Sequence, residues 1–323
     1  SIPELAEIAR NNQTIFEETQ KEYDIHYCEI RYITFAHDEA TYNDLERSCG
    51  WSNAYLIDKK DFQKEVSPYF NTNQNTYFAA QISQHCWQAT PGRVIDFIRN
   101  KGKERQGEVW EDTHLVEVHK NGGKYHVLLY THDKRYIEYE CDHFVNALGY
   151  SAERFARLYP VKHQALITHR LPNLGKNGDI LDMLIDRRKR NDFSAVYGQQ
   201  FAETGQIIAC ASPAVDAKAE ISNFDELKFN TRRFMEIISE VFCDWIPSLA
   251  TVPVQATWSG YYVEPRYIID PDNGLFVGLQ GHGFMLAQYL AKLYVDKALG
   301  RTVPDYMERL RLDGDGISEK AFK

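Results

Sequence analysis

The segment Gly278–Phe284, with the sequence GLQGHGF, combines three glycines with one histidine and can bring a ligand close to the backbone. It follows the short apolar run Leu275–Val277, which predicts a buried strand, and it precedes apolar residues at helical spacing from Met285 onward. A strand, a glycine turn and a helix in this order direct the partly positive N–H groups of the helix toward whatever lies over the turn. The segment is therefore a candidate site for an anionic or electron-rich group, the alternative being a tight turn between packed elements.

A second glycine ends the apolar run His143–Leu148, which has the character of a buried strand in a parallel sheet. This glycine, Gly149, would let a ligand approach the backbone at the carboxyl end of the strand. The preceding residues from Leu115 to Tyr139 alternate in polarity around turn residues and predict a three-strand meander.

The remaining elements alternate between helices and strands. Residues 2–22, a segment that begins at Thr90-Pro91, and Asn230–Phe242 carry apolar residues at helical spacing. Residues 27–35, 160–168, 193–198 and 207–211 are strand-like. The pattern is that of a mixed α/β protein, long enough at 323 residues for one large or two interleaved domains.

Composition excludes several classes of function. The net charge is −9, and the longest basic run is Arg187–Arg190, which argues against a nucleic-acid surface. Six cysteines without C-x-x-C spacing favour reduced thiols in an intracellular protein over disulfides or a zinc site. No apolar run approaches the ~20 residues that cross a bilayer, and no signal peptide opens the chain. The segment Gln84–Trp87 contains one histidine and one cysteine, too few for a metal site, so no metal is expected.

Three motifs carry a resemblance to a known family. FVNALG at 144–149, TWSGYY at 257–262 and GLQGHGF at 278–284 resemble the D-amino acid oxidase-like family of FAD-dependent oxidoreductases, which includes glycine oxidase, sarcosine oxidase and amino-acid dehydrogenases. In that family a V-N-A-x-G strand end, a W-x-G strand and a glycine-rich G-H-G-F turn follow one another at similar distances. The resemblance extends over nearly the whole chain.

The resemblance implies an α/β (α+β) fold with two interleaved domains. Residues 91–158 and 266–300 would form a Rossmann-like FAD-binding domain, which is incomplete in this chain. Residues 1–90 and 159–265 would form mainly an antiparallel-sheet substrate domain, and residues 301–323 a C-terminal tail across the surface.

The resemblance also implies FAD as the cofactor. Leu115 occupies the position whose backbone contacts the adenine, the alternative being a plain core residue. The helix after Gly283 is the candidate for stabilising the negative charge that builds on the reduced flavin. The residues expected at the cofactor are Leu115, Ala147, Gly149, Gly281, His282, Gly283, Phe284 and Met285.

On the substrate side, Arg266 with Tyr261 or Tyr262 is the candidate set for binding a carboxylate, because a guanidinium matches two carboxylate oxygens. The alternative for Arg266 is a surface residue in the turn after Pro265. His163 stands where the resembling strand has glycine, and it either places an imidazole near the flavin or fills a gap.

The family's N-terminal strand, G-x-G-x-x-G turn and helix are absent from this sequence. The resemblance aligns Ser1 with the helix after that unit. We expect a missing segment, as part of the same protein or as a partner chain, because an open slot in a parallel sheet exposes unpaired backbone.

The resulting hypothesis is a cytoplasmic FAD-dependent amine or amino-acid oxidase or dehydrogenase. Such an enzyme oxidises a C–N bond by hydride transfer to flavin N5, and its other partner is a small amine or amino-acid substrate. The alternative hypothesis is a non-catalytic structural subunit that keeps the fold without FAD.

Overall fold

The computed structural model describes residues 3–50, 53–152, 158–214, 229–264 and 266–314 of the chain. The chain divides into two compact units. The first unit contains Ser1–Tyr23, Pro91–Leu158 and Val263–Lys323, and the second contains Asp24–Thr90 and Tyr159–Tyr262. The helix at the start of the chain thus belongs to the first unit, whereas the sequence prediction had grouped residues 1–90.

The second unit is built on an eight-stranded mixed sheet with strand order β11-β7-β10-β9-β8-β1-β3-β2. Its strands are β1 (Cys28–Ala36), β2 (Ala54–Asp58), β3 (Ala79–Gln88), β7 (Tyr159–Thr168), β8 (Met183–Asp186), β9 (Phe193–Gln200), β10 (Ile207–Pro213) and β11 (Val254–Glu264). Strands β1 and β8 pair in parallel, and β8, β9, β10 and β7 pair antiparallel in that order. The cysteine and histidine of Gln84–Trp87 lie in β3, as an ordinary strand would place them.

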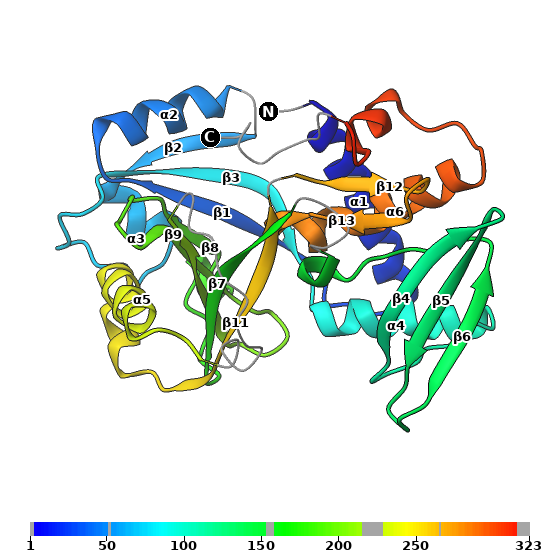
Figure 1. Cartoon of the computed structure of the whole chain (residues 1–323). Coiled ribbons are helices and arrows are strands. Elements are labelled where there is room, and N and C mark those ends of the chain that lie inside the picture. The colour runs from blue at the N-terminus through cyan, green and yellow to red at the C-terminus, as the bar shows by residue number, and fades with distance from the viewer. Residues whose placement is uncertain (1–2, 51–52, 153–157, 215–228, 265, 315–323) are drawn as a thin grey trace. The chain divides into compact units, whose positions relative to one another are not determined.

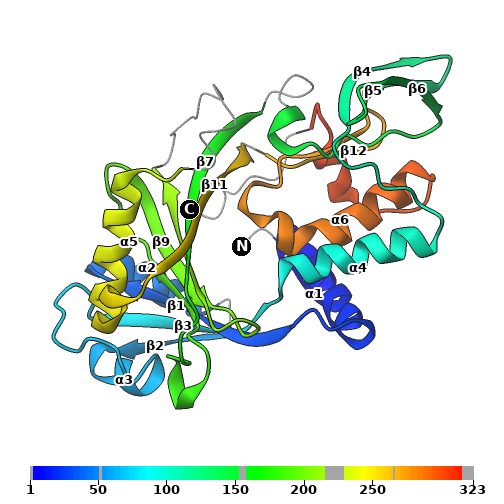
Figure 2. The ribbon, with the colours of Figure 1, turned by 90° about the horizontal axis from the view of Figure 1, so that it is seen from below.

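One face of this sheet carries the core of the second unit. Alternate residues of β9 and β10, including Val196 and Ala209, are buried and pack with α5 (Arg232–Trp245), which crosses the strands in Figures 1 and 2. Helix α5 begins at Thr231, whose side chain accepts a hydrogen bond from the Phe234 N–H at 3.1 Å. The other helices of this unit are α2 (Glu39–Cys49) and α3 (Phe62–Glu65), with short 3₁₀ turns at Lys59–Asp61, Lys176–Gly178 and Pro247–Thr251.

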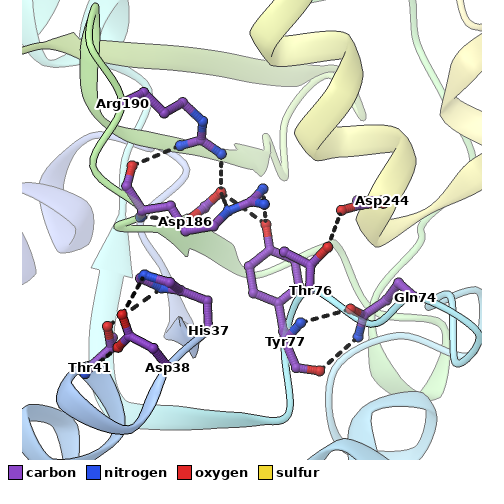
Figure 3. Close-up of polar contacts among 10 residues, drawn as sticks. His37, Asp38, Thr41, Gln74, Thr76, Tyr77, Asp186, Arg190 and Asp244 are labelled. Carbon is purple, nitrogen blue, oxygen red and sulfur yellow. Dashed lines mark hydrogen bonds and ion pairs between the residues drawn. The ribbon is translucent and has the colours of Figure 1, made fainter.

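A buried ionic cluster joins β8 to the segment before β3 (Figure 3). Asp186 is fully buried and accepts hydrogen bonds from Tyr77 at 2.9 Å, Arg188 at 2.9 Å and Arg190 at 2.7 Å. Burial alone would raise the pKa of Asp186, but the hydrogen bond from Arg190 and the charge of Arg188 lower it below its ordinary value. Because the carboxylate is matched by two guanidinium groups and a phenol, we interpret this cluster as a structural one.

The described residues of the first unit form a three-stranded meander, a two-stranded ribbon and three α-helices. The meander is β4 (His114–Asn121), β5 (Lys124–Tyr130) and β6 (Tyr136–Cys141), and the ribbon is β12 (Ile268–Asp270) with β13 (Leu275–Val277). The helices are α1 (Pro3–Glu22), α4 (Pro91–Glu104) and α6 (Gly283–Ala298), with 3₁₀ turns at Gly149–Ala152, Gln280–His282 and Asp305–Leu310.

Helices α1 and α6 lie side by side and share a core (Figures 1 and 2). Ile8 of α1 and Leu290 of α6 are fully buried in it. Residues 302–314 are more than a surface tail, because Tyr306, Met307 and Leu310 are buried in the same cluster.

The prediction of a buried strand at His143–Leu148 is only partly correct. The segment forms a single parallel bridge, between Asn146 and Leu275, and Val145 and Leu148 are 48% and 47% exposed. The segment is exposed because, among the described residues, β13 is the only strand that pairs with it.

Candidate functional site

The glycines Gly149 and Gly278 follow two strands that run in the same direction. Asn146 bridges Leu275 in parallel, with the Asn146 N–H donating to Gly274 O at 2.7 Å and the Phe276 N–H donating to Asn146 O at 2.9 Å. Because parallel strands end at the same edge of a sheet, the carboxyl end of residues 144–148 and the loop after β13 lie at one edge.

The loop at this edge leads directly into helix α6. The residue that precedes the helix, His282, provides no side-chain cap for the N–H groups of its first turn. Gln280 has a left-handed backbone with φ of 52° although it is not a glycine, which is a strained conformation concentrated at ligand sites in proteins. The loop therefore presents helix N–H groups and a half-buried imidazole at the strand ends.

The close approach of β13 to β12 determines the shape of this loop. A Cβ on Gly278 would lie 2.0 Å from the carbonyl oxygen of Arg266, so only glycine fits there. This approach brings Tyr267, which is fully buried, next to the loop. The Tyr267 hydroxyl lies 2.6 Å from Nδ1 of His282, and the two rings meet edge to face at 85°.

A cavity of about 470 Å³ lies against residues 144–148. Its lining includes Leu115 from β4 together with Asn146 and Leu148, so Leu115 and the V-N-A-L-G segment lie together. Among the site residues predicted from the sequence, Leu115 is the one that lines this cavity. Trp110 and Tyr139 add aromatic surface.

Asn146 has an unsatisfied polar atom at this cavity. The side chain is 1% exposed, and its Oδ1 accepts a hydrogen bond from the Leu148 N–H at 3.1 Å. No acceptor among the described residues forms a hydrogen bond with its Nδ2. A buried amide donor without an acceptor costs about 1–3 kcal/mol, so this atom is suited to a ligand or to a further polypeptide segment.

Two glycines near this edge, Gly149 and Gly283, leave room for a bound group. A Cβ on Gly149 would meet no atom within 4 Å, and one on Gly283 would meet only Leu279, at 3.7 Å. A bound dinucleotide would fill the space at both glycines. It would also accept hydrogen bonds from the first turn of α6 and from the Asn146 amide. The residues present in the first unit therefore fit FAD.

In the second unit, two of the predicted substrate-side residues contact each other. The rings of His163 on β7 and Tyr262 on β11 lie with centroids 3.7 Å apart, at an angle of 29°. Burial lowers the pKa of His163 to about 3, so the imidazole is neutral at physiological pH. Its Nδ1 is buried, and nothing in the part of the chain that the structure describes forms a hydrogen bond with it. Tyr261 points to the opposite face of β11, because side chains alternate along a strand.

Arg266 lies in the first unit and its guanidinium is already engaged. Its two terminal nitrogens donate hydrogen bonds to the carbonyl oxygens of Leu312 and Gly314. Both partners are backbone groups near the end of the described chain. To bind a carboxylate, this side chain would have to exchange or share these two hydrogen bonds.

The described part of the chain holds no group of three or more His, Cys, Asp or Glu side chains that could bind a metal ion. Nor does any helix in the described ranges have the length and apolar character needed to cross a bilayer. The six cysteines are free thiols.

Residues 2–297 match the DAO family of FAD dependent oxidoreductases, and the chain therefore belongs to that family, whose cofactor is FAD. The family, the mixed α/β fold and the cofactor inferred from the three sequence motifs are confirmed. No curated protein matched the sequence.

Solved structures share the fold at low sequence identity. L-proline dehydrogenase from P. horikoshii is 21% identical with a TM-score of 0.72, and the match covers 94% of this chain and 81% of that protein. Glycine oxidase from Bacillus cereus ATCC 14579 is 16% identical with a TM-score of 0.73, covering 95% and 85%. Iminodiacetate oxidase from Chelativorans sp. BNC1 is 16% identical with a TM-score of 0.72, covering 95% and 82%.

The sequence analysis missed two residues of this site. Asn146 was quoted within the V-N-A-L-G motif but not selected, and the signal available was a polar residue in the middle of an apolar run. Tyr267 precedes the buried pair Ile268 and Ile269 and looked like one more core aromatic. Only its 2.6 Å contact with His282 identifies it.

Proposed function

We propose that this protein is an FAD-dependent oxidoreductase that oxidises the C–N bond of an amino acid or a related amine. The observation that carries the proposal is the parallel bridge between Asn146 and Leu275, since it brings two glycine-ended strands and the uncapped start of α6 to one edge. Family membership supports the cofactor. The names of the solved neighbours, which include a proline dehydrogenase and a glycine oxidase, support the substrate class.

The residues proposed to hold FAD all lie in the first unit. Leu115 would contact the adenine end, and the segment Ala147–Gly149 would lie along the dinucleotide. Gly281, His282, Gly283, Phe284 and Met285 would lie at the flavin ring. When bound, FAD supplies the acceptor for the hydride that leaves the carbon bearing the amine.

The protein's own contribution to the reaction would be electrostatic. The first-turn N–H groups of α6 carry partial positive charge and would stabilise the negative charge of the reduced cofactor. Phe284 and Met285 are 42% and 43% exposed and offer apolar surface at the same helix end. Exclusion of water from this loop would strengthen the electrostatic effect.

On the substrate side we propose Tyr262 and His163 as one contact surface and Arg266, with Tyr261 or Tyr262, as the carboxylate-binding set. A neutral His163 would not repel a substrate ammonium group, so it is compatible with an amine substrate. The Arg266→Lys variant tests the second part of this proposal. A bidentate contact predicts at least a tenfold loss in substrate affinity, and unchanged kinetics would remove Arg266 from the site.

We also propose that a G-x-G-x-x-G segment outside this sequence completes the FAD-binding half. Val145 and Leu148 are exposed apolar residues, and Asn146 carries an unpaired buried donor beside them. A strand added next to residues 144–148 would cover the exposed side chains of Val145 and Leu148. Its carbonyl oxygens would accept hydrogen bonds from the Asn146 amide. The neighbours also contain residues outside the match, since it covers 81–85% of their chains.

Flavin binding tests the proposed function directly. The purified full-length gene product is expected to be yellow, with FAD released on denaturation, and to be bleached anaerobically by a secondary or primary amino acid. The Gly283→Ala variant, which adds one methyl group at the proposed ring position, is expected to bind FAD more weakly. A folded, colourless protein that takes up no FAD would instead favour the structural-subunit alternative.

A further inference from the structure

Tyr267 and His282 form a hydrogen bond next to the start of α6. Tyr267 is fully buried within the cluster that includes Leu286 and Leu290, so its ring position is fixed by packing. His282 is half-buried and is the residue that immediately precedes α6. A 2.6 Å separation between the phenol oxygen and Nδ1 is a short, well-formed hydrogen bond.

The chemistry of the two groups favours one direction for this hydrogen bond. A phenol has an ordinary pKa near 10 and is a better proton donor than a neutral imidazole N–H, whereas a bare imidazole nitrogen is the better acceptor. Tyr267 therefore donates to Nδ1. In a neutral imidazole the proton must then be on Nε2.

We propose that Tyr267 is a positioning residue that holds His282 as the neutral Nε2–H tautomer and fixes its ring direction, so that Nε2–H is a hydrogen-bond donor to the FAD ring. The part that concerns FAD rests on the proposed function. The part that concerns the tautomer stands on the geometry of this chain alone. Oxygen and nitrogen acceptors along the flavin ring are the class of group that this donor would bind.

Two features of the backbone make the pairing possible. Because Gly278 has no side chain, the carbonyl oxygen of Arg266 approaches it more closely than a Cβ would permit. This contact holds Arg266, the residue before Tyr267, against the loop. Gln280, at φ of 52°, gives the loop between Gly278 and His282 a left-handed turn. The hydrogen bond is therefore built into the fold of the first unit rather than formed by two mobile side chains.

The experiment compares three variants of the full chain labelled with ¹⁵N-histidine. Tyr267→Phe removes the hydroxyl and keeps the ring, and His282→Gln replaces Nε2–H with an amide donor. Tyr294→Phe is the matched control, because Tyr294 is a buried tyrosine of the same cluster whose hydroxyl donates to Phe144 O at 3.2 Å and not to the loop.

The first readout is the ¹⁵N spectrum of the His282 ring, recorded without FAD. We expect one tautomer with the proton on Nε2 in the wild type and in Tyr294→Phe, and a mixture of both tautomers in Tyr267→Phe. A wild-type ring protonated on Nδ1, or a spectrum that Tyr267→Phe leaves unchanged, would overturn the positioning role.

The second readout is FAD affinity, measured by the quenching of flavin fluorescence. Loss of one oriented hydrogen bond predicts a roughly fivefold weaker affinity in Tyr267→Phe than in the wild type. Because Tyr267 acts through His282, the double variant with His282→Gln is expected to bind FAD as His282→Gln alone does. Additive losses would overturn the link to FAD. Absence of FAD binding in every form, the wild type included, would overturn both the proposed function and the hydrogen bond from His282 to FAD. The ¹⁵N spectrum would then decide whether Tyr267 fixes the tautomer of His282.

Discussion

Gly278 and Arg266 lie so close that a Cβ at position 278 would be 2.0 Å from the Arg266 carbonyl oxygen. Gly278 also has φ of 79°, in the left-handed region that side chains disfavour. Both the space and the backbone conformation therefore require glycine, at the point where β13 ends and the proposed flavin loop begins.

The Gly278→Ala variant is expected to destabilise the first unit. The left-handed conformation costs about 1–2 kcal/mol for alanine, and the overlap with the carbonyl adds to this, so we expect a loss of roughly 3 kcal/mol or more. Urea unfolding followed by circular dichroism measures it. A loss below 1 kcal/mol would show that β12 and β13 do not approach this closely.

The Gly283→Ala variant is expected to separate stability from cofactor binding. A Cβ at this position would meet only Leu279, at 3.7 Å, and alanine is favoured over glycine in a helix by up to about 1 kcal/mol. The melting temperature should therefore stay the same or rise, while FAD affinity falls about tenfold if the methyl group occupies space that the flavin uses. Unchanged FAD affinity would place the flavin elsewhere.

The Asn146→Asp variant tests the unpaired amide donor at the 470 Å³ cavity. An aspartate can still accept the Leu148 N–H, but it lacks the two Nδ2 protons. If those protons bind FAD or the completing segment, FAD affinity should fall about tenfold at pH 7. Asn121→Asp, at an exposed position of β4 in the same unit, is the matched control and should bind FAD normally.

Folding stability is expected to depend on pH through His163. The pKa is about 3 in the folded protein and 6.5 when the chain is unfolded, so between these values the unfolded state binds more protons. Stability is therefore fully present above pH 6.5 and is lost as the pH falls toward 3, by at most about 1.4 kcal/mol per pH unit.

Urea unfolding between pH 7 and pH 4 checks this dependence. The slope of the unfolding free energy against pH should be smaller in His163→Gln, by the equivalent of at most one bound proton. It should be retained in His119→Gln, whose wild-type side chain is 60% exposed. Equal slopes in the wild type and His163→Gln would mean that the pKa of His163 is the same in the folded and unfolded protein.

The Asp186→Asn variant is expected to be among the most destabilising single changes in the second unit. It leaves Arg188 and Arg190 near a neutral amide in a buried setting, and breaking one side of a buried ion pair costs about 3–5 kcal/mol. Tyr77→Phe removes one hydrogen bond to the same carboxylate and should cost only about 1–2 kcal/mol. Thermal unfolding of the two variants provides the comparison. Equal losses of stability in the two variants would argue against a charged Asp186 paired with Arg188 and Arg190.

Local patterns were enough to predict many of the elements. Helical spacing predicted the helix that became α5, with Phe234, Ile237 and Val241 buried as expected. Turn residues predicted the meander that became β4–β6. These features depend on neighbours within a few residues, which is the range over which side-chain periodicity acts.

The sequence by itself determined the family, the cofactor and the order of the glycine-ended strands, because these follow from motifs of a few adjacent residues. The tertiary structure decided which distant residues meet. It paired Asn146 with Leu275, stacked His163 on Tyr262, and brought the Arg266 guanidinium to backbone carbonyls near the chain's end. Such contacts depend on the packing of segments far apart in the sequence, or on one close approach such as that at Gly278, and no local pattern encodes them.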